Sequence, residues 1–177
     1  MTKRVEEKPS YSFSPIANEQ CRILILGSMP GKESLAQTQY YAHPRNAFWS
    51  IMYLIAEANP TWPYERRCQT LLDHHIAVWD VLKSCVRKGS LDSAIETDSV
   101  ETNDFHDFFS MHRNIKAIFF NGAKAEALFE KWVLKQLDDT SRAIPRIRLP
   151  STSPAHAAVA KADKISQWQL HIMKYLG

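Results

Sequence analysis

Two short segments in the first third of the chain carry residue types that could bind and hydrolyse a ligand. The first is Gly27-Ser28-Met29-Pro30-Gly31, which directly follows an apolar run. Two glycines and a proline within five residues indicate a tight turn whose backbone something approaches closely. The turn alone is equally typical of a plain connection from strand to helix. Its spacing differs from that of a phosphate-binding GxxxxGK[ST] loop.

The second segment is Tyr41-Ala42-His43-Pro44-Arg45-Asn46, which continues into Ala47-Phe48-Trp49. It resembles the F-A-H-P-x-N-R-F-W segment of the mismatch-specific uracil-DNA glycosylases, where a first-strand turn written GINPG precedes it at a similar distance. The combination looks closest to the hypoxanthine-DNA (deoxyinosine) glycosylase branch of the uracil-DNA glycosylase superfamily. The resemblance covers most of the chain, from about Ile23 to the final helix, and implies a pocket for a base flipped out of DNA.

The first turn departs from its relatives at one position. In GINPG the asparagine positions the attacking water, and here Met29 replaces it with a thioether, which is only a weak acceptor. The resemblance therefore implies that Asn46 directs the water, while Gly27, Ser28 and Met29 shape the base pocket. The alternative reading of Asn46 is a helix N-cap, a position that asparagine favours.

Two further residues are candidates for holding the base. Tyr41 matches the aromatic residue on which the flipped base stacks in related enzymes, with Tyr40 as a competitor for the role. Asp80 ends the apolar run Ile76–Trp79, where uracil-specific relatives carry an asparagine that reads uracil. An ionised Asp80 would only accept hydrogen bonds, which suits the ring N–H of hypoxanthine. Asp80 could instead cap the turn that follows.

The segment Leu149-Pro150-Ser151-Thr152-Ser153-Pro154-Ala155-His156 resembles the second superfamily motif, written HPSPLS or NPSGLS. That resemblance implies that Ser151, Thr152 and Ser153 contact DNA, since small hydroxyl residues can reach phosphate oxygens. The bulky residue that wedges into the vacated base position is missing. His156 is a candidate for donating to the departing base, and a capping or surface histidine is the alternative.

The junction Phe120-Asn121-Gly122-Ala123-Lys124 is like the third strand end of this superfamily. A helix beginning near Gly122 would offer N–H groups to a phosphate, which makes Asn121 and Lys124 candidates for DNA binding. Asn-Gly is equally a plain turn, and a lysine on a first helical turn is usually only solvated.

Four apolar runs must position these residues. They predict buried strands at Arg22–Leu26, Ile76–Trp79, Ile115–Phe120 and Ile144–Leu149, the last at a sheet edge because it contains Pro145 and alternating arginines. Helical spacing appears around Phe48–Ile55, from near Ala123 to Lys135, and over Ala158–Tyr175. The alternation predicts an α/β fold with three α/β/α layers and a central, mainly parallel four-stranded sheet. Ligands bind such sheets beyond the carboxyl ends of the strands, where the candidate residues lie.

Length and composition narrow the class of protein. A chain of 177 residues, 45% hydrophobic and 23% charged, predicts a single folded domain over residues 21–177 with a flexible arm over residues 1–20. Three widely spaced cysteines predict reduced thiols and are too few for a usual iron–sulfur cluster. The net charge of +3 permits contact with DNA without arguing for it. We expect no metal and no cofactor.

These features together predict a monofunctional DNA glycosylase of base excision repair, acting on hypoxanthine in DNA. No lysine occupies a motif position, so strand cleavage is not expected. The expected partner is double- or single-stranded DNA containing a deaminated base, bound by a monomer without membrane association. We expect a cytoplasmic location, associated with the nucleoid if the source is prokaryotic. The alternatives are a glycosylase for uracil or G·U/G·T mismatches, and a non-catalytic protein that binds damaged DNA.

Overall fold

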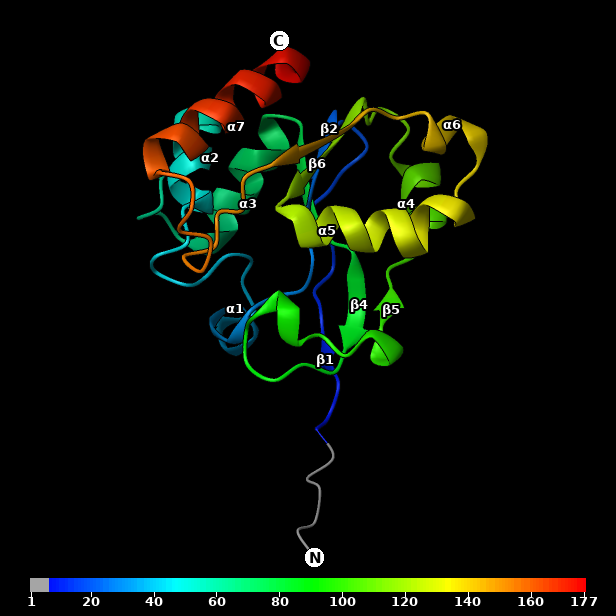
Figure 1. The fold of residues 1–177 in the computed structure, drawn as a ribbon. Coiled ribbons are helices and arrows are strands. Elements are labelled where there is room, and N and C mark those ends of the chain that lie inside the picture. Colours follow the sequence, from blue (N-terminus) through cyan, green and yellow to red (C-terminus); the bar gives the residue numbers. More distant parts are fainter. Residues whose placement is uncertain (1–6) are drawn as a thin grey trace, which may run out of the picture.

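The computed structural model describes residues 7–177, and a four-stranded parallel sheet lies at its centre (Figure 1). Its strands are β2 (Ile23–Gly27), β3 (Ile76–Asp80), β6 (Ala117–Asn121) and β7 (Arg146–Leu149), in the spatial order β3-β2-β6-β7. All the pairings within this sheet are parallel. The predicted central sheet is confirmed, and the strand with alternating arginines lies at an edge as expected.

Burial explains why these runs form strands. Every residue of β2 and β3 is buried, as is each residue of β6 before Asn121, so helices must cover both faces of the sheet. In β7 only Leu149 is buried, because an edge strand can leave its arginines in solvent. The parallel arrangement brings the carboxyl ends of all four strands to one edge of the sheet.

Helices pack on both sides of the sheet (Figure 1). One layer contains α2 (Phe48–Ala56), α3 (Tyr64–Asp73) and α7 (Lys161–Leu176), and the fully buried Trp168 anchors α7. The other contains α4 (Phe105–Met111) and α5 (Ala123–Leu128). The helix expected to run from Ala123 to Lys135 is interrupted, since its backbone becomes π-helical over Phe129–Val133 and 3-10 helical over Leu134–Gln136. Two shorter helices are α1 (Lys32–Gln37) and α6 (Asp139–Arg142).

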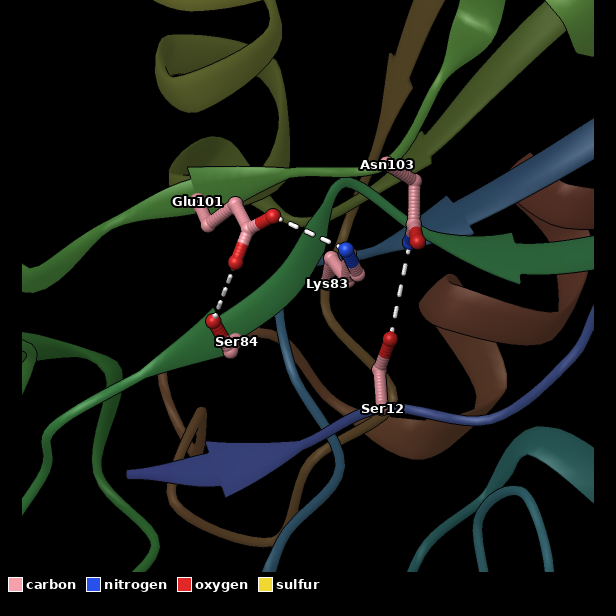
Figure 2. Close-up of polar contacts among 5 residues, drawn as sticks. All are labelled: Ser12, Lys83, Ser84, Glu101 and Asn103. Atoms are coloured by element: carbon pink, nitrogen blue, oxygen red, sulfur yellow. Dashed lines mark hydrogen bonds and ion pairs between the residues drawn. The ribbon is translucent and has the colours of Figure 1, made fainter. Parts of the chain in front are cut away.

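A second, antiparallel sheet was not expected from the sequence. It has the order β1-β4-β5 and consists of β1 (Ser10–Tyr11), β4 (Leu82–Cys85) and β5 (Glu101–Thr102). Figure 2 shows how its strands are tied together: Glu101 accepts from Lys83 at 2.9 Å and from Ser84 at 3.1 Å, and Asn103 donates to Ser12 at 3.5 Å. The Lys83–Glu101 pair is exposed and adds little stability by itself. Strand β4 follows β3 directly, so this sheet lies beyond the carboxyl end of β3.

The segment before β2 is packed on the domain. Ser10 and Tyr11 pair with β4, Ile16 forms an antiparallel bridge with Val78, and Phe13 packs against the core. This part of the expected flexible arm is therefore integrated with the domain, while residues 1–6 of that arm lie outside the described residues. In residues 7–177 no helix is long and apolar enough to cross a membrane.

Candidate active site

A cavity of about 380 Å³ opens at the carboxyl ends of the parallel strands, within the usual size range of small-ligand pockets. Its lining comes from the loops after all four strands of the central sheet. Among the residues predicted from the sequence, it is lined by Gly27, Ser28, Met29, Tyr41, Asn46, Asp80, Asn121, Ser151, Thr152 and Ser153. The structure therefore brings most of the predicted site together, although the loops are far apart in sequence.

The first turn is held rigidly against the end of β3. The Val81 N–H donates to the Gly27 carbonyl at 2.8 Å, and the Leu82 N–H donates to the Ser28 carbonyl at 3.1 Å. These bonds continue the β2–β3 pairing past the end of the sheet. Met29 is buried and belongs to the hydrophobic core while also lining the cavity. The turn thus provides a fixed wall of the cavity with the apolar side chain of Met29 in it.

Gly27 is required by close packing rather than by its backbone angles. A methyl group at this position would lie 2.5 Å from Asp80 Oδ1 and 3.0 Å from Tyr41 Oη. Real side chains do not approach so closely, so both groups would have to move. Gly27 therefore allows the Asp80 carboxyl and the Tyr41 hydroxyl to meet at one wall of the cavity.

Asp80 ends β3 and is only 3% exposed. Its Oδ2 is buried and has no hydrogen-bond partner within residues 7–177. Burial raises the pKa of Asp80 to about 8; the nearby charge of Asp92 acts in the same direction, and Arg87 opposes it. At neutral pH the carboxyl is therefore mostly protonated and can donate as well as accept a hydrogen bond. This corrects the expectation of an ionised group that only accepts.

Tyr41 adopts a left-handed backbone conformation with φ of 55°, which is costly for a bulky residue and is often found at functional sites. Its ring stacks on Phe48 with centroids 4.0 Å apart, so only the opposite face is available to a ligand. Burial, followed by the influence of Asp80, raises the pKa of the Tyr41 hydroxyl and keeps it neutral. Tyr40 is 3% exposed, and its hydroxyl donates to the Ser14 carbonyl at 3.0 Å, which favours Tyr41 for stacking.

Asn46 lines the cavity and also binds the first residue of helix α2. Its Oδ1 accepts from the Phe48 N–H at 3.0 Å, a cap-like hydrogen bond made one position before Ala47, which is the N-cap residue of this helix. This hydrogen bond leaves Asn46 able to bind a water molecule, because an amide oxygen has a second lone pair and the amide nitrogen keeps both its hydrogens. The capping bond fixes the orientation of the amide at the cavity wall.

The loop after β7 differs in part from the prediction. Thr152 is 1% exposed, its N–H and hydroxyl bind the Asn121 side chain at 2.8 and 2.9 Å, and its carbonyl accepts from the Ala47 N–H at 3.0 Å. The polar groups of Thr152 therefore form hydrogen bonds within the protein. The predicted DNA contact by Thr152 is corrected, because this residue instead links neighbouring loops. Asn121 has the same internal role. Ser151 and Ser153 are only half-buried and remain accessible.

Two predicted residues lie outside the cavity lining. His156 does not line it, and its carbonyl accepts from the largely buried Lys164 Nζ at 2.6 Å. The catalytic position expected for His156 is therefore not supported by the structure. Lys124, on the first turn of α5, also lies outside the lining, although its charge lowers the pKa of the cavity residue Asp92.

Sequence reasoning missed several titratable residues that do line the cavity, and His43 and Asp92 are two of them. His43 accepts at Nδ1 from the Arg45 N–H at 3.1 Å, which leaves Nε2 as the protonated nitrogen of the neutral ring. Asp92 enters from the segment between β4 and β5 and accepts from the Ser28 hydroxyl at 2.6 Å. His43 could have been noticed from its own motif. Asp92 lies in a polar segment whose sequence carries no comparable signal.

In residues 7–177 no group of three histidine, cysteine or acidic side chains is arranged to hold a metal ion. All three cysteines are unpaired, and Cys21 and Cys85 are buried. The side chains at the cavity provide a buried carboxyl group, an aromatic face, an oriented amide, a histidine and two further carboxyl groups, those of Glu33 and Asp92.

The chain is similar in sequence and in structure to known proteins. Residues 14–177 match the family described as the uracil DNA glycosylase superfamily. A hypoxanthine DNA glycosylase of Methanosarcina acetivorans is 35% identical over 158 residues, which cover 89% of this chain and 94% of the relative. A hypoxanthine DNA glycosylase of Methanosarcina barkeri is 39% identical over 114 residues, covering 64% and 71%. The solution NMR structure of a candidate uracil DNA glycosylase from Methanosarcina acetivorans aligns with a TM-score of 0.78 and 32% identity, covering 96% of this chain and 99% of that one.

Proposed function

Because this chain belongs to the uracil DNA glycosylase superfamily and is a DNA glycosylase, we propose that it releases hypoxanthine from deoxyinosine in DNA. The reaction is hydrolysis of the N-glycosidic bond, which leaves an abasic site and an intact strand. The relatives named for hypoxanthine support this choice over uracil. The observation that carries the proposal in the structure is the buried carboxyl of Asp80 at the cavity wall, whose Oδ2 has no hydrogen-bond partner within residues 7–177.

A neutral carboxyl presents one donor and one acceptor side by side. Hypoxanthine presents a carbonyl oxygen beside a ring N–H, so both groups of Asp80 can be satisfied at once. Adenine, guanine and thymine could pair with the same carboxyl group, but in normal DNA they are held in stable base pairs, whereas flipping costs least for a mispaired base. We propose that selection combines ease of flipping with the Asp80 contact.

The other cavity residues complete the proposed site. Tyr41 stacks on the flipped base with its free face, and the first turn of Gly27, Ser28 and Met29 bounds the pocket. Asn46 orients the water toward the anomeric carbon of the sugar. Ser151 and Ser153 are accessible for phosphate contacts, and Lys124 is a further candidate for the DNA backbone. We propose that the protein acts as a monomer without strand cleavage.

Base release from a panel of duplexes tests the substrate choice. Matched oligonucleotides would carry one deoxyinosine, one deoxyuridine or one G·T mismatch, and released bases would be separated by chromatography. Hypoxanthine is expected to be released at least about tenfold faster than uracil or thymine. Release of uracil with deoxyinosine left intact would replace this proposal with the uracil alternative, and release of thymine from G·T would favour the mismatch alternative.

The pKa of Asp80 predicts how activity depends on pH. Since only the neutral form donates, the rate constant for hypoxanthine release should fall about tenfold for each pH unit well above about 8. An Asp80→Asn variant keeps one donor and one acceptor without titrating. It should therefore retain measurable release and lose this alkaline decline. Single-turnover rates of both proteins from pH 6 to 10 would measure the effect, and identical profiles would contradict it.

A further inference from the structure

A second carboxyl group, that of Asp92, enters the cavity from outside the family motifs. It begins a 3-10 turn (Asp92–Ala94) between β4 and β5, and it is tied to the first turn although 64 positions separate it from Ser28. The Ser28 hydroxyl donates to Asp92 Oδ1 at 2.6 Å, and the Lys32 N–H donates to the Ser90 hydroxyl at 2.8 Å. These two bonds tie the segment of Ser90 and Asp92 to the first turn, and the Asp92 carboxyl is bound to Ser28, the neighbour of Met29 in the chain.

A buried positive charge lies behind this carboxyl. The Arg87 side chain is 1% exposed, its Nη1 lies 3.8 Å from Asp92 Oδ1, and its Nη2 donates to the Pro30 carbonyl. Burial raises the pKa of Asp92, while the Ser28 hydrogen bond, Arg87 and Lys124 lower it. Burial is the larger effect, so Asp92 is a stronger base than a carboxylate in water, which suits it to accept a proton.

The other carboxyl groups of the cavity are less suited to that task. Asp80 is largely neutral at pH 7 and is committed to the base in the proposed function. Glu33 lines the cavity from the exposed surface of α1, and no hydrogen bond within residues 7–177 fixes its side chain. Asp92 has one oxygen fixed by Ser28, no hydrogen bond from the described residues to Oδ2, and a side chain that is 43% exposed. Its second oxygen is thus positioned and accessible to water.

We propose that Asp92 is a catalytic residue that accepts a proton from the attacking water through its free Oδ2. The inference rests on the proposed hydrolysis and supplies the base that Met29 cannot provide. The water oxygen bonds to the anomeric carbon as the bond from that carbon to the base nitrogen breaks. The electron pair leaves with the base, which takes up a proton from solvent, and Asp92 returns its proton to solvent. The negative charge of Asp92 also stabilises the cationic sugar during the step.

The test compares Asp92→Asn with Glu33→Gln, which removes a carboxylate at the same cavity. In single-turnover release of hypoxanthine, Asp92→Asn should be at least about 100-fold slower than the wild-type protein, with affinity for abasic DNA changed less than about threefold. Glu33→Gln should keep the wild-type rate within about threefold. Added formate should partly restore the rate of Asp92→Ala, which a purely structural role of Asp92 would not allow.

An Asp92→Asn rate within about threefold of wild type would overturn the assignment, as would a loss of turnover matched by an equal loss of abasic-DNA affinity. Removing this charge leaves Arg87 buried without its counter-ion, and a lower melting temperature of Asp92→Asn would show that this cost destabilises the fold. In that case Asp92→Glu decides: a normal melting temperature with slower release supports the proposal, and a wild-type rate overturns it. If the wild-type protein itself releases no hypoxanthine, the proposed function fails instead of this assignment.

Discussion

Replacing Gly27 by alanine is expected to lower kcat/KM for base release by at least about 100-fold, since a displacement of about 1 Å in a catalytic site has an effect of that size. The added methyl would lie 2.5 Å from Asp80 Oδ1 and 3.0 Å from Tyr41 Oη. Both groups would move from the positions in which the proposed function requires them. Overpacking this buried wall should also lower the free energy of unfolding by about 1–3 kcal/mol. Steady-state kinetics and urea denaturation would measure the two effects.

Gly31→Ala is the matched control in the same turn. A methyl there would meet the Ser90 side chain at 3.5 and 3.6 Å, which is ordinary van der Waals contact. The Gly31 φ of −73° is also open to alanine. This variant should lose less than about fivefold in kcat/KM. Equal losses in the two variants would show that the turn tolerates no substitution and that the contact with Asp80 and Tyr41 is not the cause.

Replacing Asn46 by alanine is expected to lower the single-turnover rate of hypoxanthine release by about 100-fold or more, because the variant loses the amide that orients the water in the proposed function. The affinity for abasic DNA should change little. The variant also loses the cap-like bond that Oδ1 accepts from the Phe48 N–H at the start of α2, at a cost of about 1 kcal/mol in the free energy of unfolding.

Asn46→Ser separates the two roles of this residue. Serine is also a favoured N-cap, but its single hydroxyl is used by capping and does not reach as far into the cavity. The expected result is a melting temperature near that of the wild-type protein with a rate nearly as low as that of the alanine variant. If Asn46→Ala keeps the wild-type rate, Asn46 is only a cap and the proposed handling of water is wrong.

The central sheet could be predicted because its signals are local. Runs such as Ile23–Leu26 are buried on both faces, and buried parallel strands need nothing else to be recognised in a sequence. The antiparallel sheet could not be predicted in the same way. A single residue separates β4 from β3, and the partner strands β1 and β5 have two residues each. Pairing between segments that are distant in sequence therefore determines the antiparallel sheet.

The candidate site likewise has features that the sequence predicts and features that only the structure reveals. Gly27, Tyr41, Asn46 and Asp80 follow strands or stand in a motif, and the structure gathers them at one cavity. Their protonation and contacts were not predictable, because the raised pKa of Asp80 depends on burial and on the charge of Asp92.

The residues that sequence reasoning missed or misplaced depend on contacts between distant segments. The hydrogen bond from Ser28 to Asp92 spans 64 positions and has no counterpart in sequence spacing. The internal use of Thr152 likewise appears only when Asn121 and Ala47 are placed beside it. A serine-rich loop therefore indicates its location at the cavity without indicating which hydroxyl groups remain free.

Release of free hypoxanthine by the full-length protein is the most direct test of the central claim. The protein would be incubated in excess with a duplex containing one deoxyinosine, and the free base and the strand would be quantified together. The proposed function predicts one equivalent of hypoxanthine per duplex and a strand that breaks at the abasic site only after alkali treatment. Tight binding of abasic DNA without any release of hypoxanthine would contradict it.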